Sequence, residues 1–169
     1  ITRKGTGLTK KYVTQALGER FQEELGGLRF HSIQVSIERG KGEKGTSYHH
    51  LQLTRGREKR VARVLSTGER NIVALAAFFA ELNPVSTDAI VFDDPVSSLD
   101  QDRRLYVAER LAREGSERQV IVWTHDLMFL GALDEYARRH KVPLAIQTVV
   151  AIGDATGVHA YAAATDLGA

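Results

Sequence analysis

The sequence predicts an α/β fold with a mostly parallel sheet flanked by helices. Two apolar runs, residues 89–92 and 120–123, are continuous rather than alternating, which is typical of strands buried on both faces of a parallel sheet. Helical patterns at 101–114 and 127–140 follow these runs, and an apolar run at 144–152 predicts a third strand. When strands alternate with helices in this way, ligands bind beyond the carboxyl ends of the strands.

An N-terminal helix and a β-hairpin are predicted ahead of this sheet. Apolar residues recur at steps of three and four from residue 8 to residue 30, as on one face of a helix. Residues 31–37 alternate between apolar and polar, which predicts a half-buried strand, and 49–53 is its predicted antiparallel partner across a polar loop at 39–47. A further helix is predicted from Ser66 to the proline at position 84.

The composition is that of a single globular lobe. The 169 residues are 43% apolar and 26% charged, which suffices for one core, and the absence of cysteine excludes disulfides and thiolate metal sites. No apolar run is long enough to span a bilayer, so we expect a cytoplasmic protein with no membrane partner. The chain begins at Ile1 and its single methionine is Met128, which predicts a piece cut from a longer polypeptide.

Charge divides this lobe into two parts. Residues 1–64, the N-terminal helix and the basic hairpin, hold 14 Lys and Arg against 6 Asp and Glu, whereas residues 65–169 hold 9 against 15. A basic surface suits a polyanion such as DNA or RNA. Carboxylates placed at strand ends suit a divalent cation. The sequence therefore predicts different partners for the two parts.

Polar residues follow the two buried runs directly. Asp93 and Asp94 follow the first run and His125 follows the second, so all three are expected at one edge of the sheet. Adjacent carboxylates are costly there unless a cation such as Mg²⁺ neutralises them, and a histidine in the same layer can donate a hydrogen bond to a phosphate. The alternative is structural: Asp94 and Asp100 cap the next helix, and His125 precedes a capping Asp126.

Residues 65–69, Leu-Ser-Thr-Gly-Glu, open the helix that precedes these strands. A serine hydroxyl, a glycine that permits close approach, and the free N–H groups at the positive end of the helix dipole together make an anion site. Ser66 and Glu69 also have the spacing of an ordinary capping box, which is the simpler interpretation of this motif on its own.

Four segments, 65–69, 89–95, 97–100 and 120–126, resemble in order and spacing the C-terminal half of the head of an ABC-type ATPase, a P-loop NTPase. They correspond to its signature motif, Walker B motif, D-loop and switch histidine. The pattern is similar to the SMC and recombination-repair ATPases, whose head is split by a coiled coil. The string at 92–100 most resembles bacterial anticodon-nuclease-associated and phage-defence ATPases. The N-terminal helix would then be the base of the returning coil, or a helix packed beside it.

The resemblance implies that the signature residues bind a nucleotide held by a second copy of the head. Ser66 and Gly68 would contact the γ-phosphate of that ATP, with Thr67 and Glu69 beside them. Thr67 stands where the family usually has a glycine, and a polar residue is common there in the repair branch.

The resemblance also assigns roles at the strand ends. Asp93 would bind Mg²⁺, His125 would sense the γ-phosphate, and Ser98 and Asp100 would lie in the dimer interface. Asp94 stands where the family usually has the glutamate that polarises the attacking water. Aspartate is one methylene shorter, which predicts slow turnover.

A phosphate-cradling Walker A loop is missing from the sequence. The nearest string, residues 40–47, has Thr46 at the lysine position and is interpreted as the hairpin loop. The resemblance therefore implies two partners, an N-terminal lobe with the Walker A loop and a second copy of the head. The fragment is expected to be inactive alone.

A basic stretch lies between the hairpin and the signature motif. One interpretation is a solvated face, and the other is a non-specific contact with a nucleic-acid backbone. The residues concerned are Arg55, Arg57, Lys59, Arg60 and Arg63.

The leading hypothesis is the C-terminal lobe of an SMC-like ABC ATPase that dimerises on ATP and acts on nucleic acid, in DNA repair, recombination or phage defence. The first alternative is a stand-alone Mg²⁺-dependent phosphoesterase or nuclease that uses Asp93, Asp94 and His125. The second is a non-catalytic lobe for dimerisation or DNA contact.

Overall fold

The computed structural model describes residues 2–31, 35–39, 49–53, 61–82, 85–86, 88–152, 155–157 and 163–164. The N-terminal elements are α1 (Thr2–Gly27), β1 (Val35–Arg39), β2 (His49–Leu53), α2 (Val61–Val64) and α3 (Thr67–Glu81). The central elements are β3 (Ile90–Asp93), α4 (Gln101–Glu114), β4 (Val120–Trp123) and α5 (Leu127–His140). The C-terminal strands are β5 (Ala145–Ile146), β6 (Val150–Ile152), β7 (Ala155–Gly157) and β8 (Ala163–Ala164).

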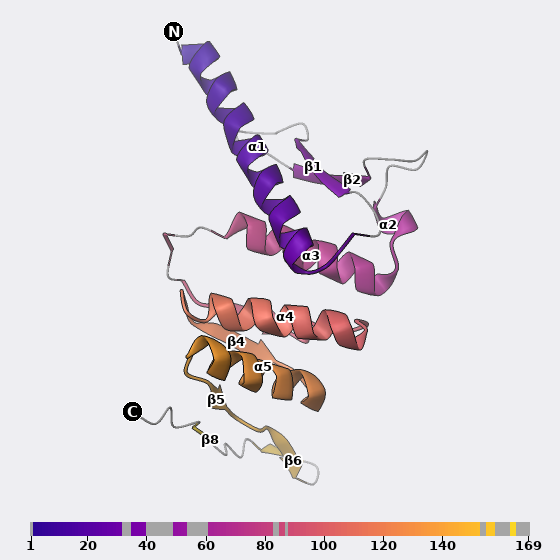
Figure 1. Ribbon diagram of the computed structural model, residues 1–169, viewed down its shortest axis with the longest axis vertical. Coiled ribbons are helices and arrows are strands. Elements are labelled where there is room, and N and C mark those ends of the chain that lie inside the picture. The colour runs from indigo at the N-terminus through magenta and orange to yellow at the C-terminus, as the bar shows by residue number, and fades with distance from the viewer. Residues whose placement is uncertain are drawn as a thin grey trace.

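Helix α1 rises from one end of the molecule with the N-terminus at its tip, and in this view α3, α4 and α5 follow below it (Figure 1). Its lower half packs on α3 and β1, whereas Tyr12 in its upper half is exposed. Among the described residues, none of the helices has the length and apolarity needed to cross a membrane.

The predicted hairpin is confirmed, and its first strand extends two residues beyond the predicted end at residue 37. Strands β1 and β2 pair antiparallel from Val35 opposite Leu53 to Arg39 opposite His49, while the connecting residues 40–48 lie outside the described part. Residues 32–34 lie outside the described part, and before them the chain turns back on α1. Arg29 has a φ of 53°, and the N–H of Phe30 donates to the Leu25 carbonyl at 2.9 Å.

The parallel sheet is also confirmed: β3 and β4 pair parallel, in register from Ile90 opposite Val120 to Asp93 opposite Trp123. The α/β fold with flanking helices is therefore as predicted. The third strand is not. Gln147 interrupts the predicted run of 144–152, which divides into β5 and β6, and these pair antiparallel with β8 and β7.

The two faces of the β3–β4 sheet differ, and the prediction that both would be buried is wrong for this chain. The face that packs against the helices carries Ile90, Phe92, Val120 and Val122. The opposite face carries Val91, Ile121 and Trp123, of which Val91 is 59% and Trp123 56% exposed. The continuous apolar run therefore supplies a second apolar face that the described residues leave uncovered.

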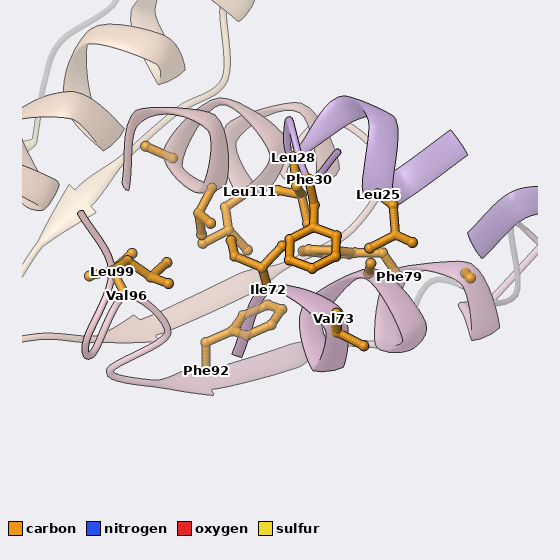
Figure 2. Close-up of a cluster of buried hydrophobic side chains, with 14 of the residues drawn as sticks. Leu25, Leu28, Phe30, Ile72, Val73, Phe79, Phe92, Val96, Leu99 and Leu111 are labelled. Atoms are coloured by element: carbon orange, nitrogen blue, oxygen red, sulfur yellow. The ribbon is translucent and has the colours of Figure 1, made fainter. Parts of the chain in front are cut away.

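Side chains from α1, α3, β3, the turn after β3, and α4 form the core on the covered face (Figure 2). The Phe92 ring lies 5.4 Å from that of Phe78 and 5.7 Å from that of Phe79. Each large side chain buried here contributes about 1.5–3 kcal/mol. The labelled residues of this cluster are Leu25, Leu28, Phe30, Ile72, Val73, Phe79, Phe92, Val96, Leu99 and Leu111.

A charged network fastens α1 to α4 at the edge of this core. Arg110 donates to both carboxylate oxygens of Glu24, at 2.8 and 2.9 Å, and to Glu114 at 2.8 Å. Its guanidinium lies 4.2 Å from the centre of the Phe79 ring, and Glu114 also pairs with Arg118. Burial alone would lower the pKa of Arg110, but the hydrogen bonds with the two glutamates outweigh it and raise that pKa.

Candidate functional site

The N-terminus of α3 is closed by the predicted capping box. The Ser66 hydroxyl accepts a hydrogen bond from the Glu69 N–H at 3.2 Å, and the Glu69 carboxylate accepts one from the Ser66 N–H at 2.9 Å. Hydrogen bonds to the Glu69 carboxylate, first from the Ser66 backbone N–H and then from the Ser66 side chain, lower the pKa of Glu69. Ser66 is exposed, so an anion at this end of α3 would compete with the Glu69 carboxylate for the hydrogen of the Ser66 hydroxyl. The hydrogen bonds of the two backbone N–H groups in the capping box do not use that hydrogen and are compatible with anion contact.

The other two signature residues differ in exposure. Thr67 is exposed, and its hydroxyl accepts a hydrogen bond from Arg70 at 3.1 Å. Gly68 is buried, and a Cβ on it would lie 2.4 Å from the Ser98 carbonyl oxygen. Glycine is thus required for α3 to approach the turn after β3. Asn71, one turn further along α3, donates to the Ser97 carbonyl at 2.8 Å.

The strand ends bring the predicted polar residues together. Asp93 closes β3 opposite Trp123, and its side chain is exposed. Asp94 follows with a φ of 44°, and its N–H donates to the Trp123 carbonyl at 2.8 Å, so β4 holds this unusual backbone. His125 Nδ1 lies 3.4 Å from Asp94 Oδ2, and the His125 side chain is 86% exposed. The structure thus brings His125 and Asp94 together at the carboxyl edge of the sheet, and Asp93 ends β3 at the same edge.

Two other carboxylates near the site, those of Asp100 and Asp126, cap helices. Asp100 caps α4 by accepting from the Arg103 N–H at 2.9 Å, and Asp126 caps α5 by accepting from the Phe129 N–H at 3.0 Å. Asp94 caps neither helix, so the capping alternative is right for Asp100 and wrong for Asp94. Ser98, beside Asp100, is exposed with a φ of 63°.

Sequence reasoning missed Arg104, which joins the turn before α4 to the loop between β4 and α5. Its Nε donates to the Leu99 carbonyl at 3.1 Å and its Nη1 lies 2.7 Å from Asp126 Oδ2. An arginine in the first turn of a helix gives no sequence signal of such a bridge, because its partners come from different loops. Asn71 was missed for the same reason.

The described residues contain no cluster of three His, Cys, Asp or Glu side chains arranged to hold a metal ion. Mg²⁺ commonly binds through one or two carboxylates together with waters and phosphate oxygens. The exposed carboxylate of Asp93 fits such a partial ligand set. Of the basic stretch, Arg63 lies exposed in α2, whereas Arg55, Arg57, Lys59 and Arg60 lie outside the described residues.

A parallel strand pair with acidic and histidine side chains at its carboxyl edge, packed by helices on one face, is typical of α/β folds that bind a ligand at that edge. Residues 29–149 match the family model AAA_13, described as an AAA domain. The match spans more than half of the chain, and the chain therefore belongs to this AAA domain family. No curated protein sequence matches the chain.

Solved SMC ATPase heads share the fold. One structure, described as concerning the ATP-driven dimerization and DNA-stimulated activation of SMC ATPases, matches with a TM-score of 0.61 and 19% identity, over 90% of this chain and 88% of that one. An SMC head bound to the C-winged helix domain of ScpA matches with a TM-score of 0.59 and 20% identity, over 78% of this chain. The SMC head domain from Thermotoga maritima matches with a TM-score of 0.50 and 24% identity, over 80% of this chain. The chain spans 40% and 44% of the lengths of these last two structures.

Proposed function

We propose that the chain is the signature-bearing C-terminal lobe of an SMC-like ATPase head, which hydrolyses ATP between two copies of the head. The observation that carries the proposal is the contact between His125 and Asp94, one residue after Asp93, at the carboxyl edge of β3 and β4. The capped N-terminus of α3 contacts the turn that follows these carboxylates, through Gly68. Under this proposal, the strand ends serve one nucleotide, and the signature residues of the same lobe serve the nucleotide of the opposite head.

The proposed chemistry assigns one task to each side chain. Asp94 accepts the proton of the attacking water, and His125, 3.4 Å away, donates a hydrogen bond to the γ-phosphate. Asp93 would hold Mg²⁺, which supplies charge neutralisation for the phosphate oxygens when bound. The short side chain of Asp94 must approach the water more closely than a glutamate would, which supports slow turnover.

The uncovered face of the β3–β4 sheet supports a partner lobe that carries the Walker A loop. Val91, Ile121 and Trp123 form an apolar surface that ends at Asp93, so a lobe seated on this face would bring its phosphate loop to the carboxylates. Trp123 is the only tryptophan of the chain and reports on this surface. Its quenching by acrylamide should fall when the N-terminal lobe of the parent polypeptide is added.

A second copy of the head is proposed as the other partner. Exposed side chains at the start of α3 and in the turn before α4 would face the nucleotide and the dimer interface of the opposite head, namely Ser66, Thr67, Ser98 and Asp100. The ATP-driven dimerization named for the matched SMC ATPases supports this arrangement. We further propose that the parent acts on nucleic acid in DNA repair or phage defence, and the DNA stimulation named for the same proteins supports that part.

The test measures MgATP hydrolysis and nucleotide binding by the parent polypeptide. Asp94→Asn and His125→Ala should each lower kcat by about tenfold or more while ATP binding is retained. Glu135→Gln is the matched control, because Glu135 is an exposed carboxylate on α5 that pairs with Arg139. Unchanged hydrolysis in both variants would contradict the proposal.

The alternatives are tested with the same proteins. A stand-alone phosphoesterase or nuclease would cleave DNA or RNA with Mg²⁺ and without ATP. A non-catalytic lobe would leave the parent without ATP turnover at any nucleotide concentration. Strong MgATP hydrolysis by the 169-residue chain alone would contradict the need for a second lobe.

A further inference from the structure

Arg104 contacts both loops of the candidate site. It binds the Leu99 carbonyl at 3.1 Å, in the turn that carries Ser98 and Asp100, and the Asp126 carboxylate at 2.7 Å. The side chains of Arg104 and Asp126 are 33% and 16% exposed, so this ion pair is less screened by solvent than a surface pair. A forked guanidinium holds two acceptors at once in a fixed geometry.

Asp126 fixes the backbone on which His125 stands. Its Oδ1 accepts from the Phe129 N–H at 3.0 Å, and its own N–H donates to the Thr124 hydroxyl at 3.1 Å. His125 lies between Thr124 and Asp126 in the chain, and its Nδ1 lies 3.4 Å from Asp94 Oδ2. The place of the ring therefore depends on where Asp126 is held.

The turn before α4 is held from its other side by α3. Asn71 donates to the Ser97 carbonyl and Gly68 packs directly on the Ser98 carbonyl. Because α3 begins at the signature motif, contacts link that motif to the turn before α4 and, through the turn, to Arg104. Arg104 in turn contacts the His125 loop, residues 124–126.

We propose that Arg104 is a positioning residue that couples the turn of residues 96–100 to the His125 loop. The coupling rests on the proposed function: a second head that presses on Ser98 or Asp100 moves the Leu99 carbonyl, and Arg104 transmits that movement to Asp126 and His125. Arg104 has no role in the chemistry itself.

The first test does not depend on ATP. In the 169-residue chain, Arg104→Met should shift the NMR resonances of the His125 ring and of the His125 and Asp126 amides. Arg113→Met is the matched control, because Arg113 lies on the same helix and pairs with Glu109 by an exposed contact. It should leave those resonances in place. Unchanged His125 resonances in Arg104→Met would overturn the proposal.

The second test uses MgATP turnover by the parent polypeptide. Arg104→Met should lower kcat by about tenfold with little change in KM, since a small displacement of a catalytic group costs rate rather than binding. In a His125→Ala background the same substitution should cost no further activity. An additive loss in the double variant, or an unchanged kcat in Arg104→Met, would overturn the coupling.

A milder variant decides the question if Arg104→Met unfolds the chain. Asp126→Asn keeps an N-cap acceptor for the Phe129 N–H and removes only the charge that pairs with Arg104. It should displace the same His125 resonances, and their constancy would overturn the proposal. A parent polypeptide without ATP turnover would contradict the proposed function alone, because the NMR comparison still tests the contact.

Discussion

The two faces of the β3–β4 sheet are built from the same kind of residue and have opposite environments. Phe92 and Ile90 lie among the rings and aliphatic side chains of the helices, each no more than 8% exposed. Their neighbours Val91 and Trp123 lie on the other face and are mostly exposed. An apolar face at the carboxyl edge of a parallel sheet is unusual without a cover, because parallel sheets are generally packed on both sides.

The difference shows which parts of the fold this chain stabilises by itself. The covered face is closed by the core of Figure 2 and by the Arg110 network, which ties α1 to α4. The uncovered face ends at Asp93 and lies next to the His125 loop. Stability thus resides on one side of the sheet, and the proposed function requires contacts on the other.

The largest expected loss of stability comes from a substitution on the covered face. Phe92→Ala removes a ring that packs against Phe78 and Phe79, and should lower the free energy of unfolding by about 3–5 kcal/mol. Urea unfolding of the 169-residue chain, followed by circular dichroism, measures it. Val91→Ala, on the next position of the same strand, is the control and should change stability by less than about 0.5 kcal/mol. Equal losses in the two variants would mean that the faces do not differ.

A second test removes the link between α1 and α4. Arg110→Met leaves the half-buried Glu24 without its cation, while Glu114 keeps Arg118, and should cost about 1–3 kcal/mol, since a partly buried carboxylate that loses its hydrogen bonds is more costly than a lost surface pair. The same urea titration measures the change. Arg139→Met on α5 breaks an exposed pair with Glu135 and a surface contact with the Tyr136 ring, and its stability should stay within about 1 kcal/mol of the unchanged chain.

A third test acts where the signature helix approaches the turn. Gly68→Ala places a methyl group 2.4 Å from a backbone oxygen that cannot rotate away, so α3 or the turn must shift at a cost of about 1–3 kcal/mol. Gly131→Ala is the matched control, because nothing lies within 4 Å of a Cβ on that helical glycine. It should be neutral or slightly stabilising. A stable Gly68→Ala chain would show that the approach is looser than the structure has it.

Much of the fold was predictable because its signals are local. The capping box at Ser66, the continuous runs that form β3 and β4, and the stop after α1 depend on residues close in sequence. The third strand was not, because a polar break at Gln147 and antiparallel partners further along the chain decided the pairing.

The candidate site was likewise predictable in part. Asp93, Asp94 and His125 were placed by the rule that strand ends meet at one edge of a sheet. Gly68 was predicted as a site residue, but the contacts that Gly68, Asn71 and Arg104 make with partners 22 to 30 residues away were not, because no periodicity records them. The exposure of Val91 was unpredictable for a related reason: the sequence specifies an apolar strand but not which chain covers it.

The smallest expected effect is a pH dependence of folding stability that arises on the packed side of the sheet and not on the uncovered face. Glu69 is charged at the N-terminus of α3, on the packed side, and its pKa is lowered by its hydrogen bonds with Ser66. A depressed pKa stabilises the fold above the usual value near 4.5, and this contribution is lost as pH falls through the folded-state pKa. The effect should be about 0.3–1 kcal/mol, as for other carboxylates at exposed helix N-termini. Urea midpoints between pH 6 and pH 3 should fall less in Glu69→Gln than in the unchanged chain, whereas Ile121→Ala, which alters only the uncovered face, should keep the full pH dependence. A Glu69→Gln chain with an undiminished pH slope would remove the capping carboxylate from the forces that hold α3 in place.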